Sequence, residues 1–434
     1  MSIVVSKSAP VVVRPSEPAT STADKILLST LDKPVVTIPV TVLLAFDHPI
    51  HDATAETIKT ALAQSLVHYY PIAGRISCDN DDGGDFYIDC TGEDLGVTFV
   101  AASANCTMEE LMCLVDDQPP DDETAVVQQL AFNCTPDDLH HRLLWVQVTT
   151  LNCGGFVVGV TWSHGVADGP GIAQFIQDVG ELARGLPSPS VVPVRLDDKI
   201  ATQAVPPFTM AVHRFISGLK PVSNLDVRNV TVSSSLINHI IVGARRRATV
   251  FEAVAAVLWQ CRTRVVMTDP EAPAVLLFAV NARKYLGAKD GYYGCCTAMH
   301  MAVSKSGTVA NGDIMKLVGI IRRAKEQIPE QLKADDGEMM LRTMVGEKQV
   351  NGYESLLYLT SWRNIGFEDV DFASGKTARV MTYPPRMLSM MPRIAPICFM
   401  LKATEEGVRV MSDCVTADHA DAFYQEIAKL KATT

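Results

Sequence analysis

The spacing of apolar residues predicts a mixture of strands and helices in the N-terminal half of the chain. Pro170–Arg184 has helical spacing, and Gly185 behind it suits the left-handed conformation that often closes a helix. The strand expected just before this helix is almost wholly apolar, which is typical of a strand buried on both faces. In chain order, the expected elements of this half are a strand at Val35–Phe46, a helix at His51–Tyr69, neighbouring strands at Leu143–Thr149 and Gly155–Trp162, and the helix at Pro170–Arg184.

The C-terminal half shows the same mixture after a stretch rich in proline. Arg184–Phe208 has little periodicity and is typical of an interdomain linker. Because each half mixes strands with helices, we predict an α/β (mixed α+β) fold of two layered domains, residues 1–184 and 229–434, joined by a linker over 185–228. The elements expected in the second half are strands at Asn229–Ile237, Ala274–Val280, Ala378–Tyr383, Ile394–Ala403 and Val408–Cys414, and helices at Thr249–Arg264, Ile314–Gln331, Gly337–Val345 and Ala417–Lys431.

Composition and charge narrow the class of protein. The 434 residues include 47% hydrophobic and 20% charged residues, as expected for a globular chain with sizeable cores. The formal net charge of −11 disfavours general binding to nucleic acid or to an anionic membrane, so neither partner is expected. The N-terminus has no signal-peptide pattern, and Val35–Phe46, interrupted by Pro39, is too short to span a membrane. The eleven cysteines show no CxxC spacing and fit reduced thiols, so we expect a cytoplasmic protein.

The sequence His164-Gly165-Val166-Ala167-Asp168-Gly169 is the sharpest candidate for chemistry. It begins where the apolar strand is predicted to end, so rigid backbone would hold the imidazole beside a cavity. With an ordinary pKa of about 6.5, a histidine can take a proton from an alcohol or an amine at neutral pH. Asp168 could orient the ring or fix the turn. Taken alone, the pattern more often marks a core histidine followed by an aspartate that caps a helix.

Other chemical motifs are weak or missing. The acidic pair at 137–138 and the histidine pair at 140–141 lack a metal-ligand spacing such as HExxH, so no metal site is predicted. Cys295 and Cys296 have no evident base partner and are interpreted as small core residues. The sequence has no GxSxG, Walker or GxGxxG motif, which argues against the corresponding hydrolases, nucleotide hydrolases and dinucleotide-binding proteins.

Seven short motifs together resemble the plant BAHD acyltransferases, which transfer acyl groups from coenzyme A thioesters. Any one of them is weak, whereas all of them in the family's order extend over nearly the full chain. The motifs are Leu31-Asp32, Tyr70-Pro71-Ile72-Ala73-Gly74-Arg75, the His164 motif, Thr249-Val250-Phe251-Glu252, Val280-Asn281-Ala282-Arg283, Gly291-Tyr292-Tyr293-Gly294, and Ser361-Trp362 leading to Asp371-Phe372-Ala373-Ser374-Gly375-Lys376.

The resemblance implies two chloramphenicol-acetyltransferase-like domains joined by a long crossover loop, with a tunnel between them. It also implies a monomeric enzyme without a permanently bound cofactor, in which acyl-CoA is a co-substrate and a small alcohol or amine is the acceptor. His164 would be the general base, and attack on the thioester would form a tetrahedral intermediate that expels the coenzyme A thiolate. A hydroxycinnamoyl or benzoyl donor is expected, while an acetyl donor and the choice between O- and N-acylation stay open.

The resemblance assigns roles to residues around the histidine and the donor. Asp168 would be structural and would pair with Arg283, which would lock the loop that carries His164. Thr249 and three arginines precede a predicted helix near the place where relatives contact the nucleotide part of coenzyme A. Guanidinium groups suit phosphate, although a solvated basic loop explains them equally well. These arginines are Arg245, Arg246 and Arg247.

The chain departs from the family at the motif that usually reads DFGWG. Ala373 replaces the first glycine, and Ser374 replaces a tryptophan whose indole N–H helps to bind the oxyanion in some relatives. Thr37 aligns with a threonine credited with a similar role and is the alternative oxyanion donor. The positions that match the motif, and that would be structural, are Asp371, Phe372 and Gly375.

The acceptor is only partly constrained by the sequence. Asn364 stands where relatives that acylate shikimate or quinate usually have an arginine, which argues against an acidic acceptor, although Arg363 is adjacent. An amine acceptor arrives protonated and would benefit from acidic groups at the entrance, for which Asp32, Asp47 and Glu252 are candidates. The altered DFGWG motif also allows a second hypothesis, in which the chain binds ligands or partners without turnover.

Overall fold

The computed structural model describes residues 3–18, 23–50, 53–78, 85–92, 95–117, 125–134, 136–244, 247–346, 350–383 and 395–432. The chain divides into two compact units whose segments alternate in sequence. Unit 1 comprises Met1–Gln203, Leu286–Cys296 and Arg363–Met390, and unit 2 comprises Ala204–Tyr285, Thr297–Trp362 and Met391–Thr434. Within the described ranges, no helix is both long enough and apolar enough to cross a membrane.

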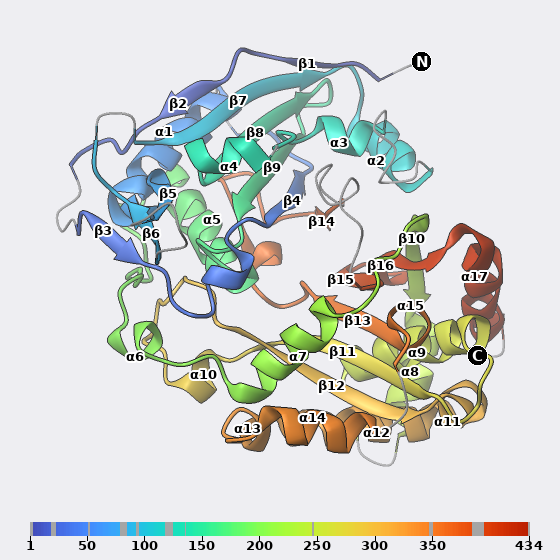
Figure 1. The fold of residues 1–434 in the computed structure, drawn as a ribbon. Helices are drawn as coiled ribbons and strands as arrows, with labels where there is room; N and C mark the ends of the chain where they lie inside the picture. Colours follow the sequence, from blue (N-terminus) through green and yellow to red (C-terminus); the bar gives the residue numbers. More distant parts are fainter. Residues whose placement is uncertain are drawn as a thin grey trace. The chain divides into compact units, whose positions relative to one another are not determined.

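Unit 1 contains a seven-stranded sheet with the strand that precedes the candidate histidine near its middle (Figure 1). The pairs along it are antiparallel except for one parallel pair, β7 with β8. The order is β1 (Val5–Lys7), β7 (Val97–Ala104), β8 (Leu144–Leu151), β9 (Phe156–Ser163), β4 (Pro39–Phe46) and β14 (Arg379–Met381), with β2 (Val11–Val13) also paired to β7. A second sheet has the order β3 (Lys25–Leu27), β6 (Phe86–Asp89) and β5 (Arg75–Cys78).

The helices of unit 1 include two long ones, α1 and α5, which pack against each other. Their apolar residues are buried at helical spacing, as in Ile58, Leu62 and Leu66 of α1. The helices are α1 (Thr54–His68), α2 (Met108–Asp117), α3 (Val126–Gln129), α4 (Pro136–His141), α5 (Gly169–Ala183) and α6 (Asp198–Ala201), with 3-10 turns at Lys33–Val35, Tyr70–Ala73 and Phe367–Asp369.

Unit 2 contains a six-stranded mixed sheet and a helix, α9, that is buried along almost its whole length. The strand order is β10 (Leu225–Ser233), β16 (Gly407–Thr416), β15 (Ile397–Ala403), β13 (Leu356–Ser361), β11 (Pro273–Asn281) and β12 (Thr297–Lys305). The helices are α7 (Pro207–Ser217), α8 (Ser234–Gly243), α9 (Val250–Val266), α11 (Ser306–Asn311), α12 (Ile314–Glu326), α13 (Ile328–Gln331), α14 (Gly337–Val345), α15 (Gly352–Ser355) and α17 (Ala417–Ala432), and α10 (Arg283–Leu286) lies where the chain passes to unit 1.

Most elements predicted for the N-terminal half are confirmed. Strands β8 and β9 pair antiparallel, and β9 is buried along its whole length, as its apolar sequence predicts. The strand predicted from Val35 instead begins at Pro39, because the residues before it form a 3-10 turn in which the Val35 N–H donates to the Asp32 carbonyl (3.2 Å). Proline is tolerated at the first position of a strand. Of the helix expected at His51–Tyr69, residues 51 and 52 lie outside the described ranges.

The elements predicted for the C-terminal half are confirmed with two corrections, and Ile394, the first residue of one predicted strand, lies outside the described residues. The strand expected to reach Ile237 ends at Ser233, whose hydroxyl accepts from the Leu236 N–H and starts helix α8. The helix predicted over Ile314–Gln331 is divided into α12 and α13, with a proline in the first turn of the second. Strands β12 and β13 were not predicted.

The units differ from the continuous domains that we expected. Part of the predicted linker over 185–228 is helical, because Pro207–Ser217 forms α7 with Phe208, Ala211 and Val212 buried. The predicted C-terminal domain over 229–434 contains two segments, Leu286–Cys296 and Arg363–Met390, that belong to unit 1. Strand β14 lies in the second of these and pairs with β4. Long-range pairing of this kind has no local sequence signal.

Candidate active site

His164 is held at the end of the buried strand β9. Its backbone N–H donates to the Ile38 carbonyl (2.9 Å), and the Ser163 hydroxyl donates to the Val36 carbonyl (2.7 Å). These two bonds tie the histidine loop to the turn that precedes β4. Gly165 allows the close approach, since a Cβ atom there would lie 2.6 Å from the Val36 Cα.

The ring of His164 lies in an environment that favours its neutral form. The residue is half-buried, and within the described ranges its Nδ1 atom is buried without a hydrogen-bond partner. Burial lowers the pKa of His164 below its ordinary value, while the charges of Asp168 and Asp32 and the histidine's own backbone partly offset this effect. A neutral imidazole can accept a proton. Because Nδ1 is closed off, Nε2 is the nitrogen left to exchange a proton with a substrate.

Asp168 caps the helix that follows the histidine. One carboxylate oxygen accepts from the Gly171 N–H (3.0 Å) at the start of α5, and the other accepts from the Cys296 N–H (2.9 Å). The carboxylate therefore fixes both the loop and the segment that contains Cys296, in agreement with a structural role. Arg283 donates to the Asn281 side chain through its backbone N–H (3.1 Å). Because Asp168 and Arg283 belong to different units, the expected pair between them stays a prediction.

Two residues with no predicted part in the site, Arg195 and Cys295, lie beside the histidine loop together with Asp32. Asp32 is fully buried and accepts from the Cys295 N–H (2.9 Å) and from the Arg195 guanidinium (3.0 Å). The same guanidinium donates to the Gly165 carbonyl (3.4 Å). Asp32 is therefore not a free acid at a substrate entrance. Arg195 lies in the proline-rich stretch, where no periodicity marks it, and a backbone N–H has no sequence signature.

The other two acidic candidates for an amine entrance differ in their surroundings. Glu252 is buried, forms ion pairs with Arg322 (3.2 Å) and Lys325 (2.8 Å), and has a lowered pKa because these hydrogen bonds outweigh desolvation. It therefore links the start of α9 to α12 within unit 2. Asp47 is exposed at the end of β4.

The loop that replaces DFGWG is organised by the carboxylate of Asp371. One of its oxygens accepts from the N–H groups of Ala373 (2.8 Å), Ser374 (3.2 Å) and Gly375 (3.1 Å). The side chain of Phe372 is buried against Phe46, with ring centroids 5.3 Å apart. Ala373 has a φ of +71°, where the family's glycine would be unstrained.

The oxyanion donors remain predictions. Ser374 is buried, and its hydroxyl has no hydrogen-bond partner among the described residues. Thr37 is exposed and lies in the turn between Val36 and Ile38, whose carbonyls hold the histidine loop. Thr37 is therefore close to His164 along this turn, although it is not in the strand where the sequence placed it.

The residues proposed to contact coenzyme A are only partly described. Arg245 and Arg246 lie outside the described residues, and Arg247 is exposed. Thr249 forms a capping box with Glu252: its hydroxyl accepts from the Glu252 N–H (3.2 Å), and its own N–H donates to the Glu252 carboxylate (3.0 Å). Thr249 thus begins helix α9, and its contact with the nucleotide stays a prediction.

Cys295 and Cys296 are buried, in agreement with their interpretation as core residues. The described part of the chain contains no group of three or more His, Cys, Asp or Glu side chains placed to hold a metal ion. The histidine pair at 140–141 lies in the short helix α4.

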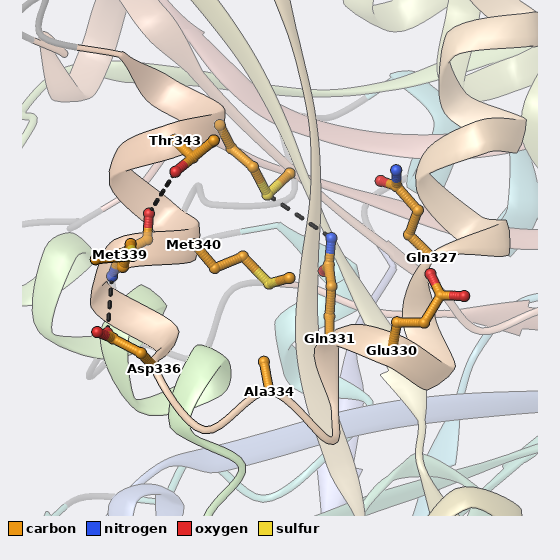
Figure 2. Close-up of a pocket in the computed structure, with 9 residues that line it drawn as sticks. Gln327, Glu330, Gln331, Ala334, Asp336, Met339, Met340 and Thr343 are labelled. Carbon is orange, nitrogen blue, oxygen red and sulfur yellow. Dashed lines mark hydrogen bonds between the residues drawn. The ribbon is translucent and has the colours of Figure 1, made fainter.

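A pocket of about 390 Å³ lies in unit 2 between α13 and α14, and it includes none of the predicted site residues (Figure 2). Two of its polar side chains have local partners: Asp336 accepts from the Met339 N–H (2.9 Å), and the Thr343 hydroxyl donates to the Met339 carbonyl (2.8 Å). Gln331 donates to the Met344 sulfur, while its buried amide oxygen has no hydrogen-bond partner among the described residues. The described residues that line the pocket therefore offer amide, carboxylate, hydroxyl and thioether groups and no histidine.

The Transferase family model matches residues 3–411 of the chain. The chain is 99% identical over 434 residues to Acyl transferase 15 of Oryza sativa subsp. japonica, with both sequences fully covered. It is 30% identical to the myricetin 3-O-glucosyl 1,2-rhamnoside 6'-O-caffeoyltransferase AT2 of Crocosmia x crocosmiiflora, over 98% of this chain and 99% of that protein. It is also 30% identical to the benzyl alcohol O-benzoyltransferase of Petunia hybrida, over 86% of this chain and 81% of that protein.

Solved structures show the same fold. Vinorine synthase superimposes with a TM-score of 0.75 at 20% identity, covering 98% of each chain. TRI101 of F. graminearum, solved in complex with coenzyme A and T-2 mycotoxin, superimposes with a TM-score of 0.66 at 18% identity, covering 92% of this chain and 96% of that chain. The predicted mixed α/β fold of the chloramphenicol-acetyltransferase type is confirmed.

The family match, the curated relatives and the fold define an acyltransferase that uses acyl-CoA. The chain belongs to the Transferase family, that of the BAHD acyltransferases.

Proposed function

We propose that this enzyme transfers a hydroxycinnamoyl or benzoyl group from coenzyme A to the hydroxyl or amine of a small plant metabolite, with His164 as general base. The observation that carries the proposal is the half-buried imidazole at the end of β9, whose pKa is lowered and whose backbone is fixed by the Ile38 carbonyl. Such a ring is neutral at the pH of the cell and is attached to a backbone that a hydrogen bond holds in place.

The reaction balances without a metal or a covalent acyl-enzyme. Nε2 of His164 takes the proton of the acceptor O–H or N–H as the acceptor oxygen or nitrogen bonds to the thioester carbonyl carbon. The carbonyl π electrons move to oxygen, which gives a tetrahedral oxyanion. When the carbonyl reforms, the C–S bond breaks, and the coenzyme A thiolate takes the proton from the imidazolium. A positioned base contributes about 10²- to 10⁴-fold to the rate of such a step.

The names of the curated relatives support an aromatic donor. One of them is a caffeoyltransferase and another is an O-benzoyltransferase, and both come from plants. Their acceptors are a glycosylated flavonol and benzyl alcohol respectively, so these relatives acylate hydroxyl groups. We therefore rank an alcohol acceptor above an amine.

The test is turnover by the purified full-length protein with matched histidine variants. We expect thiol release from caffeoyl-, p-coumaroyl- or benzoyl-CoA that depends on a mixed pool of alcohols and amines, with the product identified by mass spectrometry. His164→Gln should lower kcat by about 10²- to 10⁴-fold. The control is His141→Gln, an exposed histidine in α4, which should leave turnover unchanged. Full turnover by His164→Gln, or turnover with acetyl-CoA alone, would contradict the proposal.

A non-catalytic role is the second candidate, and the observation that favours it is Ser374. Its short buried hydroxyl stands where the family has an indole donor, so oxyanion stabilisation by that route is lost. Isothermal titration with acyl-CoA separates the two functions. Coenzyme A binding without acceptor-dependent thiol release across the whole pool would favour the non-catalytic protein.

A further inference from the structure

We infer that Arg195 and Asp32 form a buried positioning pair that sets both the place and the charge environment of the His164 loop. The inference rests on the proposed function, because it gives the pair a role only if His164 exchanges a proton with the substrate. Both side chains are buried, with Arg195 8% exposed and Asp32 0% exposed. The motif of the histidine loop does not include either residue.

The guanidinium of Arg195 joins the histidine loop to the turn before β4. Its Nη2 atom lies 3.0 Å from Oδ2 of Asp32 and 3.4 Å from the carbonyl oxygen of Gly165, the residue directly after His164. Asp32 lies in the turn before β4, and its Oδ2 atom also accepts from the Ser29 N–H (2.8 Å). The pair therefore fixes the peptide next to the histidine to the same turn that receives the histidine's own N–H.

Two segments of unit 1, residues 191–195 and residues 291–296, pair with each other, and together we call them the clasp. Residues 291–296 hold Arg195 in place. The Val194 N–H donates to the Gly291 carbonyl (2.9 Å), and the Tyr293 N–H donates back to the Val194 carbonyl (3.0 Å). The guanidinium also reaches the Tyr292 hydroxyl (3.4 Å). All of these residues belong to unit 1.

The clasp binds both carboxylates that flank the histidine. The N–H of Cys295 donates to Asp32 (2.9 Å), and the next N–H, that of Cys296, donates to Asp168 (2.9 Å). Arg195 supports the loop at Gly165, directly behind the histidine, and Asp168 supports it at the start of α5. The loop is thus fixed on both sides of Val166 and Ala167.

The pair also has an electrostatic consequence that a purely mechanical support would lack. The charges of Asp168 on the same loop and of Asp32 on the turn before β4 raise the pKa of the imidazole, and the guanidinium paired with Asp32 reaches the carbonyl of Gly165, the next residue in the chain. Together Arg195 and Asp32 are neutral. Removal of one leaves the charge of the other near the ring in a poorly solvated site, and the two removals act with opposite sign.

The test measures the pKa of His164 directly by NMR of the full chain labelled at histidine, with the signal assigned through His164→Gln. In Arg195→Gln the unpaired Asp32 carboxylate stabilises the imidazolium, so the pKa should rise by about half a unit to one unit. In Asp32→Asn the unpaired guanidinium should lower it by a similar amount. In the double variant the shifts should cancel. The control Arg228→Gln removes an exposed ion pair in unit 2 and should shift nothing.

Kinetics of the same variants distinguish positioning from stability. Arg195→Lys keeps the charge but loses the planar fork, so kcat should fall about tenfold while KM for acyl-CoA and the pKa of His164 stay near those of the wild type.

Shifts of equal sign in the pKa of His164 in the two single variants, or no shift in variants that melt cooperatively, would overturn the inference. If a single variant does not fold, the double variant and Arg195→Lys still decide it, since a pKa outside the wild-type range in either would contradict the pairing.

The titration is independent of turnover, so the two proposals can fail separately. Full activity of His164→Gln would reject the histidine as base and leave the opposite pKa shifts unaffected. Unshifted pKa values together with an inactive His164→Gln would reject the positioning pair and leave the proposed function standing.

Discussion

At the scale of single residues, the half-buried position of His164 decides which protonation state the ring has at neutral pH. Burial disfavours the imidazolium, whereas the negative charges of Asp168 and Asp32 favour it. Burial is the larger effect, so the pKa is lowered. Asp168 is already engaged by two backbone N–H groups, which spreads part of its charge away from the ring. A neutral ring of this kind can accept a proton without first losing one, as the proposed role of general base requires.

The pH dependence of turnover follows from this direction. Because the pKa of His164 lies below about 6.5, kcat/KM should stay constant as the pH falls from 8 and should drop only below pH 6.5. The sign is fixed by the neutral ring, which is lost as the pH falls through the lowered pKa. Initial rates with benzoyl-CoA and an alcohol between pH 5 and 8 provide the measurement, and an alcohol is chosen because an amine would add its own titration. An acidic limb at or above pH 6.5 would contradict the assignment.

At the scale of elements, the start of α5 is where the histidine loop becomes a regular helix. Asp168 is its N-cap, and Gly169-Pro170-Gly171 forms the first turn. Gly171 is required by close packing, since a Cβ atom there would lie 1.9 Å from the Tyr293 carbonyl oxygen. The clasp can approach the helix only because this position has no side chain.

The variant Gly171→Ala tests this packing. We expect it to destabilise the protein by about 1–3 kcal/mol through overpacking against backbone, and to lower kcat because the cap at Asp168 moves with the turn. The matched control is Gly319→Ala in α12, where the added Cβ would lie 3.6 Å from the end of the Arg323 side chain. That change should be neutral or stabilise the protein by about 0.4–1 kcal/mol. Urea unfolding of both variants measures the difference, and equal midpoints would refute the packing argument.

Elements with a strong local signal were predictable, and irregular connections were not. The apolar run of β9 and the capped helices α5 and α9 follow directly from the sequence. The His164 motif could also be found there, because its residues are contiguous. The clasp could not be predicted: it holds the site through backbone N–H groups of Cys295 and Cys296, which any residue except proline would provide.

At the scale of the whole molecule, unit 1 is completed by segments from the second half of the sequence. Residues 286–296 include the second segment of the clasp, 291–296, and residues 363–390 supply β14 and the Asp371 loop. The boundary expected near residue 184 is inferred from the proline-rich stretch that begins there. Composition along the chain cannot show which later segments fold back into unit 1. One such segment carries the altered DFGWG motif, which therefore lies in unit 1 and not in a separate C-terminal domain.

A fragment of residues 1–203 tests whether unit 1 is complete without these segments. It lacks β14 and the donors to Asp32 and Asp168, so two buried carboxylates lose hydrogen bonds and β4 becomes an edge strand. We expect a fragment that binds ANS and melts without a cooperative transition, in contrast to the full chain under the same conditions. A sigmoidal urea transition with native-like near-UV circular dichroism would show that the first 203 residues fold alone.

The distance in sequence between the histidine loop and the second segment of its clasp, residues 291–296, sets a delay during synthesis. Asp168 and Cys296 are 128 residues apart, and Asp32 and Cys295 are 263 residues apart. At roughly 5–20 residues per second, about 6–25 s separate the appearance of Asp168 from that of its partner. During this interval Asp32 and Asp168 each lack one of their hydrogen-bond donors. The histidine loop therefore cannot form all of its final hydrogen bonds until long after the strand that precedes it has been made.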